Sequence, residues 1–314
     1  MALRQVIDAL ELLDHPQAGG TLLRQTLEGR EFAGGLEVIE VSSPRGKTDF
    51  VRFRFPGTRG KSGGGEAPTL GIIGRLGGVG ARPERVGLVS DGDGAVVAIA
   101  AALKLGQMAA RGDVLAGDVI VATHICPNAP VRPHFPVPFM DSPVNMRTMN
   151  SHEVSPEMDA ILSIDTTRGN RVVNARGFAI SLPVKEGYIL KASHRLLELA
   201  EVASGRPPVV LPLSTQDITP YGNDLYHINS ILQPSCVTSA PVVGVALTSE
   251  VVVPGCATGA SPPADIEMAV RFVLEVAKEF GTGVARFYDA DEYARLVALY
   301  GSMSHLQGPG RGPQ

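Results

Sequence analysis

The chain has 314 residues, of which 44% are hydrophobic and 19% are charged, and its formal net charge at pH 7 is −4. This length suits one large α/β domain or two smaller ones. The slightly acidic balance offers no electrostatic footprint for nucleic acid, so we expect no nucleic-acid partner.

The sequence also lacks the usual features of an anchored or secreted protein. No stretch approaches the roughly 20 apolar residues that span a bilayer, and the N-terminal segment 1–15 mixes acidic residues among its apolar ones, unlike a signal peptide. The three cysteines, Cys126, Cys236 and Cys256, are widely spaced without a CxxC pair. This argues against a disulfide scaffold and favours a reducing compartment. We expect a cytoplasmic protein without a membrane partner, and a homo-oligomer stays open.

The spacing of apolar residues predicts the secondary structure of the first half of the chain. In chain order it predicts helices over 2–14 and 20–29, strands over 36–41, 49–55 and 69–76, a helix over 94–110 and a buried strand over 117–125. The Pro-rich stretch 127–156 shows no clear periodicity but is rich in apolar residues. We therefore expect an ordered loop packed over the domain.

The second half continues the alternation of strands and helices. It predicts strands over 159–165, 172–184, 207–213 and 240–247, helices over 191–204, 263–280 and 290–300, and a disordered tail over 303–314. Buried strands that alternate with helices imply right-handed βαβ units. The fold class is thus α/β, a mostly parallel mixed sheet flanked by helices, in a single domain over 1–302.

Ligands of open α/β sheets bind at the carboxyl ends of the strands, and polar residues gather at three such ends. The sequences are "GRLGGVG" from 74, "THICPNAP" from 123 and "SIDTTRGN" from 163. Asp91 and Asp93, within "SDGDG", open the helix between the first two strands. One aspartate would serve as the N-cap of that helix. Two aspartates and two glycines in four residues exceed what a single cap needs, so a ligand role stays open.

Asp165 and His124 each allow a structural and a functional interpretation. Asp165 closes an apolar strand, where an unpaired carboxylate would be costly, so it is either hydrogen-bonded by the following turn or a ligand. His124 is either a satisfied core histidine or part of a site. As residues i and i+2 of a strand, His124 and Cys126 face the same side. Together they could bind a metal or form a base–nucleophile pair.

Two further segments carry candidate binding residues. The polar stretch 215–230, "TQDITPYGNDLYHINS", includes Asp217 and His227, which either line a site or belong to a surface loop with turn chemistry. Cys256 lies in a loop of small residues before the last long helix. Backbone amides there either hold an anion or are simply close-packed.

The order of these elements over roughly residues 2–282 resembles the catalytic domain of co-catalytic zinc aminopeptidases, with the phosphorylase/hydrolase-like fold. The resemblance implies that Asp91, followed by Gly94, bridges two metals, and that Asp165 is a strand-ending ligand. Other positions depart from the family pattern. Its His-x-Asp reads Arg75-Leu76-Gly77 here, its Glu-Glu falls on "HICP", and its last histidine falls near Cys256.

Several phrases also resemble a bacterial family known only as domain of unknown function 1177, over nearly the full length. They are "GRLGGVGARPE", "LVSDGDGA", "THICPNAP", "QDITPYGN" and "VPGCATGAS". This resemblance implies no activity, because none is assigned to the family.

Three hypotheses about function follow. In the first, one divalent metal, zinc or manganese, activates water to hydrolyse a small amide or peptide. Its metal ligands would be Asp91, His124 and Asp165, with Cys126 or the 217–227 region, which contains Asp217 and His227. Arg75 or Arg82 would hold the substrate carboxylate.

The second hypothesis is a metal-free binding protein. There the Arg75 guanidinium replaces the charge of a lost metal and pairs with Asp91. The third makes Cys126 or Cys256 a nucleophile with His124 or His227 as its base. Against it, buried cysteines usually serve as small hydrophobic residues.

Overall fold

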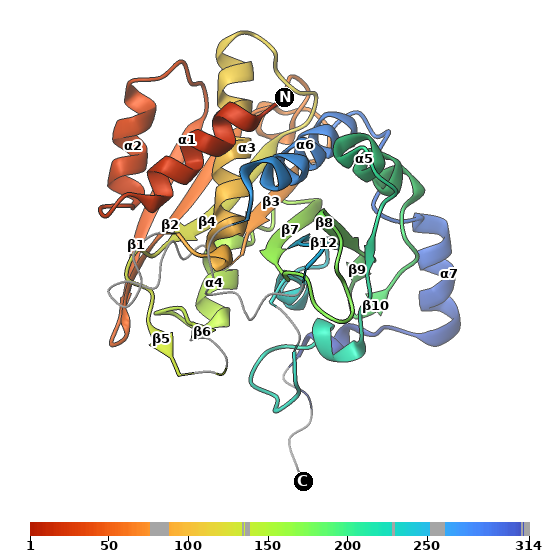
Figure 1. The fold of residues 1–314 in the computed structure, drawn as a ribbon. Coiled ribbons are helices and arrows are strands. Elements are labelled where there is room, and N and C mark those ends of the chain that lie inside the picture. The colour runs from red at the N-terminus through yellow and green to blue at the C-terminus, as the bar shows by residue number, and fades with distance from the viewer. Residues whose placement is uncertain are drawn as a thin grey trace.

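The computed structural model describes residues 1–75, 88–133, 135, 139–227, 230–251, 261–308 and 310 (Figure 1). The long helices are α1 (Leu3–Asp14), α2 (Gly20–Glu28), α3 (Asp93–Ala110), α4 (Met146–Glu153), α5 (His194–Ser204), α6 (Pro263–Phe280) and α7 (Ala290–Tyr300). The strands are β1 (Gly35–Ser43), β2 (Gly46–Phe55), β3 (Leu70–Gly74), β4 (Val119–Ile125), β5 (Val131–Arg132), β6 (Phe139–Met140), β7 (Ala160–Thr166), β8 (Gly177–Ser181), β9 (Val184–Lys185), β10 (Tyr188–Ile189), β11 (Val210–Leu211) and β12 (Val242–Thr248).

A mixed sheet of ten strands forms the centre, in the order β1-β2-β4-β3-β7-β12-β8-β11, with β9 and β10 attached beside β12. Its middle strands β4, β3, β7 and β12 run parallel, whereas β2 is antiparallel to both β1 and β4. At the other end of the sheet β8 is antiparallel to β12 and parallel to β11. The predicted α/β fold with a flanked, mostly parallel mixed sheet is confirmed. The carboxyl ends of the four parallel strands meet at one edge, which we call the carboxyl edge.

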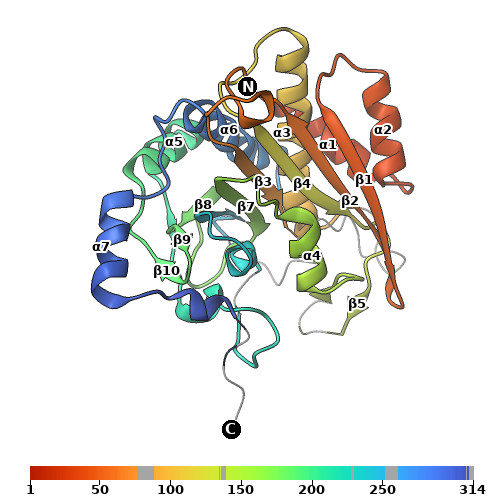
Figure 2. The same cartoon turned by 180° about the vertical axis from the view of Figure 1, so that it is seen from behind.

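Helices α1, α3, α5 and α6 lie together on one face of the sheet, as both views show (Figures 1 and 2). Their apolar side chains form the main core with those of β3, β4, β7 and β12. A smaller core on the other face packs the segments around 218 and 231–232 against the sheet. Both faces of the central strands are thereby buried, which explains their continuous apolar sequences.

Helix α3 begins in close contact with the carboxyl edge. A Cβ atom at Gly94 would lie 2.7 Å from the carbonyl oxygens of Arg75 and Ile164, and one at Gly74 would lie 2.4 Å from the Gly94 oxygen. Only glycine permits this approach. The two glycines therefore fix the segment that carries Asp91 against the ends of β3 and β7.

One helix, Ser90–Ala110, is long and apolar enough to cross a membrane by length and composition, although the sequence had suggested no such stretch. In the structure 78% of this window is buried inside the domain. Its hydrophobicity is that of a core helix, which is apolar all round because other elements surround it.

The structure changes the interpretation of three segments. The stretch 127–156, expected to be a loop, includes helix α4, with Asn145 as its N-cap. The single strand expected over 172–184 is two strands, β8 and β9. The tail was expected to be disordered from 303, but Ser304–Gln307 forms a 3-10 helix, η5, and the Gln307 amide donates to the backbone oxygen of Ser235 at 2.7 Å.

Candidate functional site

Three of the predicted site residues lie at the ends of adjacent parallel strands. Arg75 directly follows β3, His124 is in β4, and Asp165 is in β7. Since β3 lies between β4 and β7 in the sheet, Arg75 lies between the other two. The topology thus brings together groups that are far apart in the sequence.

Arg75 is fully buried and forms an ion pair with Glu153, the last residue of α4. The other carboxylate oxygen of Glu153 lies 2.7 Å from Nδ1 of His124. An ionised carboxylate only accepts hydrogen bonds, so Nδ1 carries the hydrogen. Arg75 also contacts Sδ of Met146, at the start of α4. We call Arg75, Glu153 and His124 the buried charge network, and it ties α4 to the carboxyl edge.

The network differs from the pairing expected in the binding-protein hypothesis. Arg75 was expected to pair with Asp91, but among the described residues its ion-pair partner is Glu153. Both guanidinium and carboxylate are completely buried. A buried charge is costly unless it is paired and hydrogen-bonded. Glu153 pairs with Nη1 of Arg75, whereas the buried Nε of Arg75 has no hydrogen-bond partner among the described residues.

Asp165 is hydrogen-bonded within the site. Its Oδ2 accepts from Oγ of Ser230 at 2.6 Å and its Oδ1 from the backbone N–H of Thr166 at 2.7 Å. Burial raises the pKa of Asp165, while these hydrogen bonds and the nearby Arg75 charge act in the opposite direction. The structural role predicted from the sequence, an aspartate hydrogen-bonded by the following turn, accounts for the bond from Thr166. It does not account for the bond from Ser230, which lies 65 residues away in the sequence.

Neither Asp91 nor Asp93 caps helix α3, because the N-cap position is Gly92 and has no side-chain cap. Asp93 instead accepts hydrogen bonds from the hydroxyls of Thr166, at 3.0 Å, and Ser261. Burial raises the pKa of Asp93 to about 6. Asp93 therefore joins α3 to the end of β7, and Asp91 lies beside a cavity.

A cavity of about 980 Å³ opens at the carboxyl edge, and we call it the edge cavity. Three of the predicted site residues line it: Asp91, Asp165 and His227. Of the other described candidates, Arg75, His124, Cys126 and Asp217 do not line it. Arg75 was expected to hold a substrate carboxylate, but its complete burial keeps it from direct contact with a ligand in this cavity.

The polar stretch 215–230 divides into a structural and a cavity-lining part. Asp217 accepts hydrogen bonds from the backbone N–H and the hydroxyl of Ser214, at 2.8 and 2.9 Å, in a capping box of the 3-10 helix η3 (Thr215–Ile218). The His227 ring packs against Tyr221 with 4.4 Å between centroids. Burial lowers the pKa of His227, which favours its neutral form.

The Cys126 thiol is buried and donates to the backbone oxygen of Lys47 at 3.3 Å. Burial raises its pKa to about 11, so it is protonated at neutral pH and a weak nucleophile. The pairing of Cys126 with His124 stays a prediction that this environment does not favour. Arg82 and Cys256 lie outside the described residues.

The donor set does not fit the two-metal centre that the resemblance implies. In the part of the chain that the structure describes, no group of three or more His, Cys, Asp or Glu side chains is placed to hold a metal ion. Arg75 lowers the pKa of Asp165 and its ion-pair partner Glu153 raises it, so the charges of the pair act on Asp165 in opposite directions.

The sequence reasoning missed five charged residues of this region. They are Glu153 of the buried charge network and Arg45, Arg132, Asp141 and Arg147, which line the edge cavity. A signal for Glu153 existed, since Asn145 precedes α4 and its side chain accepts from the N–H of Thr148. An asparagine cap followed by helix-forming residues indicates a helix start.

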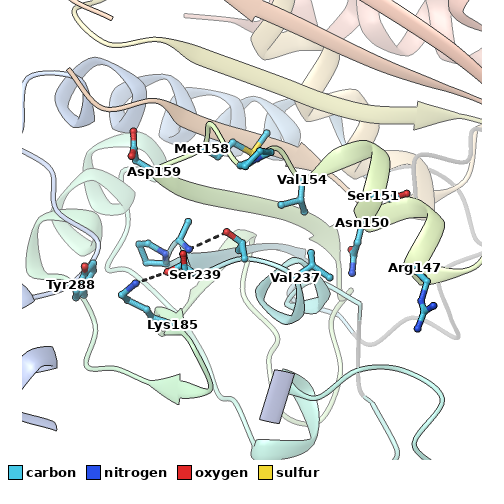
Figure 3. A pocket seen from close by; sticks show the side chains of 14 residues that line it. Arg147, Asn150, Ser151, Val154, Met158, Asp159, Lys185, Val237, Ser239 and Tyr288 are labelled. Atoms are coloured by element: carbon cyan, nitrogen blue, oxygen red, sulfur yellow. Dashed lines mark hydrogen bonds between the residues drawn. The ribbon is translucent and has the colours of Figure 1, made fainter. Parts of the chain in front are cut away.

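A second cavity, of about 660 Å³, also borders α4 (Figure 3). Arg147, Asn150 and Ser151 contribute to it from α4, so Arg147 borders both cavities. Lys185 donates to the backbone oxygen of Ser239. None of the described candidates from the sequence lines this cavity. We therefore place the candidate site at the edge cavity.

Comparisons with known proteins agree with this architecture. A family model described as "Protein of unknown function (DUF1177)" matches residues 39–310. No curated protein matches the chain. A tomato leucine aminopeptidase variant superposes with a TM-score of 0.51 and 12% identity, over 87% of this chain and 61% of its own. This chain thus spans about three fifths of that enzyme.

A glutaminyl cyclase from an Acidobacteriales bacterium superposes with a TM-score of 0.50 and 12% identity, over 90% of this chain and 94% of its own. At such identity the likeness concerns the fold alone. The predicted aminopeptidase-like fold is thereby confirmed.

Proposed function

The chain belongs to the DUF1177 family, and we propose that it binds a small amide or peptide in the edge cavity without a metal ion. In this proposal the fixed charge of Arg75 takes the place of the metal charge that the aminopeptidase resemblance implies. Asp91 and Asp165 line the cavity that holds the ligand, and the buried charge network fixes α4 against the carboxyl edge.

The observation that carries the proposal is the position of Arg75. Its guanidinium is fully buried at the end of β3, paired with Glu153, and it acts on Asp165. A guanidinium is always charged and its planar shape suits fixed, multiple hydrogen bonds. In the proposal its charge is shared between Glu153, with which it is paired, and Asp165, whose pKa it lowers, at the strand ends where the resemblance implies a metal.

Within the proposal, each polar group has a distinct role. Asp165 is held by Ser230 and Thr166, so its orientation is fixed before a ligand arrives. Such preorganisation reduces the entropy that binding costs. Asp91 and Asp165 would accept hydrogen bonds from ammonium or amide N–H groups of the ligand.

A second candidate function is the hydrolysis of a small amide or peptide with one zinc or manganese ion. The observation that favours it is that Asp91, Asp165 and His227 line the same cavity. Carboxylate and imidazole groups are suitable ligand types for either metal, although among the described residues these three are not grouped as a metal site. When bound, the ion would lower the pKa of a water molecule and so supply a nucleophile.

Metal content separates the two candidates. We would measure it by mass spectrometry on protein purified without chelator or affinity tag, before and after soaking with zinc or manganese, together with Asp91→Ala. The binding proposal predicts less than a stoichiometric amount of metal in all samples. About one divalent ion per chain, lost in Asp91→Ala, would overturn it in favour of the hydrolase and would justify assays on small amides and dipeptides.

A further inference from the structure

The two ends of the edge cavity carry opposite charge. Its inner end holds Asp91 and Asp165, each only 3% exposed. Its outer wall holds Arg45, Arg132 and Arg147, from the β1–β2 turn, β5 and α4, and all three are exposed. A ligand that enters the cavity therefore meets guanidinium groups outside and carboxylates inside.

The positive charge of the outer wall is only partly compensated. Arg45 and Arg132 both bind Oδ2 of Asp141, at 2.8 and 2.6 Å, so two guanidinium groups share one carboxylate. Arg147 forms no ion pair or hydrogen bond with its side chain to any residue that the structure describes. The three arginines thus keep two positive charges beyond what Asp141 neutralises.

Three methionines also line the edge cavity. Met140 and Met149 are buried, and Met146, next to Arg147, contacts Arg75 of the buried charge network. Unbranched methionine side chains adapt to differently shaped partners. The cavity is therefore suited to apolar side chains of varied size.

We infer that the ligand of the edge cavity is a short peptide with a free terminal carboxylate, bound by Arg147 with help from Arg45 and Arg132. Guanidinium groups bind carboxylates through paired, charge-assisted hydrogen bonds. The opposite end of the peptide donates N–H groups to Asp91 and Asp165, and its side chains lie along the methionines. This inference rests on the proposed binding function, and it moves the carboxylate-binding role from Arg75 to the three arginines of the outer wall.

The test compares two pools of peptides. Protein is dialysed to equilibrium against an equimolar pool of dipeptides, and separately against the same dipeptides with amidated C-termini. Peptides retained with the protein are quantified by mass spectrometry, so the preferred side chains need not be known beforehand. The variants are Arg147→Gln and, as a matched control, Arg24→Gln, which alters another exposed helical arginine that does not line the cavity.

We expect wild type and Arg24→Gln to retain members of the free-carboxylate pool, and Arg147→Gln to bind them about tenfold or more weakly, as expected for loss of a charge-assisted bond. Equal retention of the amidated pool, or an unchanged Arg147→Gln, would overturn the carboxylate inference and leave the binding function standing. Retention of neither pool would overturn the proposed function itself. Circular dichroism of each variant confirms that it is folded.

Discussion

The buried charge network makes a quantitative prediction for Glu153→Gln. This substitution keeps the shape of the side chain but removes the charge that pairs with Arg75. The guanidinium of Arg75 and Nδ1 of His124 both donate hydrogen bonds to Glu153. The new amide can offer them only a neutral oxygen or an NH2 group, which is itself a donor. Breaking a fully buried ion pair from one side costs about 3–5 kcal/mol.

The size of the effect on thermal unfolding follows from the length of the chain. At about 2.1 cal/mol/K per residue, the unfolding entropy of 314 residues is about 0.7 kcal/mol/K. A loss of about 3–5 kcal/mol therefore lowers Tm by about 5–8 °C. We would measure Tm by differential scanning calorimetry and confirm the loss of free energy by urea unfolding.

Glu157→Gln is the matched control. Glu157 also pairs with an arginine, Arg54, but both side chains of that pair are about half exposed. A solvent-exposed pair contributes less than about 1 kcal/mol, so Tm should fall by no more than about 1–2 °C. Equal losses in Glu153→Gln and Glu157→Gln would refute the view that the network ties α4 to the carboxyl edge.

Three further predictions concern the same region. Because Cys126 is buried and its pKa is raised, it should resist iodoacetamide at pH 7.5 in the native protein and react after unfolding. Peptide mapping would measure the labelling, and rapid labelling of the native protein would contradict its burial. Burial raises the pKa of Asp93 to about 6, so its folded form binds a proton more tightly than the unfolded chain and stability falls as pH rises from about 4 to 6. Asp93→Asn should remove about 3 kcal/mol of that decline, measured by urea unfolding at pH 4 and pH 7, and an unchanged pH dependence would count against it. In Gly94→Ala the new Cβ meets backbone oxygens at 2.7 Å, so the free energy of unfolding should fall by about 1–3 kcal/mol. In the control Gly63→Ala the Cβ has open space around it, and stability should change by less than about 0.5 kcal/mol. Equal Tm values for the two variants would show that α3 can shift.

The order of helices and strands could be predicted because apolar periodicity is a local property of the chain. The helix over 94–110 and the buried strand over 117–125 correspond closely to α3 and β4. Helix α4 was missed because its amphipathic pattern is short and lies within a Pro-rich stretch. Its eight residues offer little more than two turns of periodicity, and tertiary contacts stabilise such helices more than their own sequence does.

The sequence by itself determined the fold class and the edge of the sheet where polar groups gather, and it placed Asp91 and Asp165 at that edge. Only the tertiary structure decided the partners of these groups. Arg75 and Glu153 are 78 residues apart, and their pairing depends on where α4 crosses the ends of the strands. The three arginines of the outer wall come from separate segments in the same way. Charge pairing acts over a few ångströms in space, whereas a sequence pattern records only neighbours along the chain.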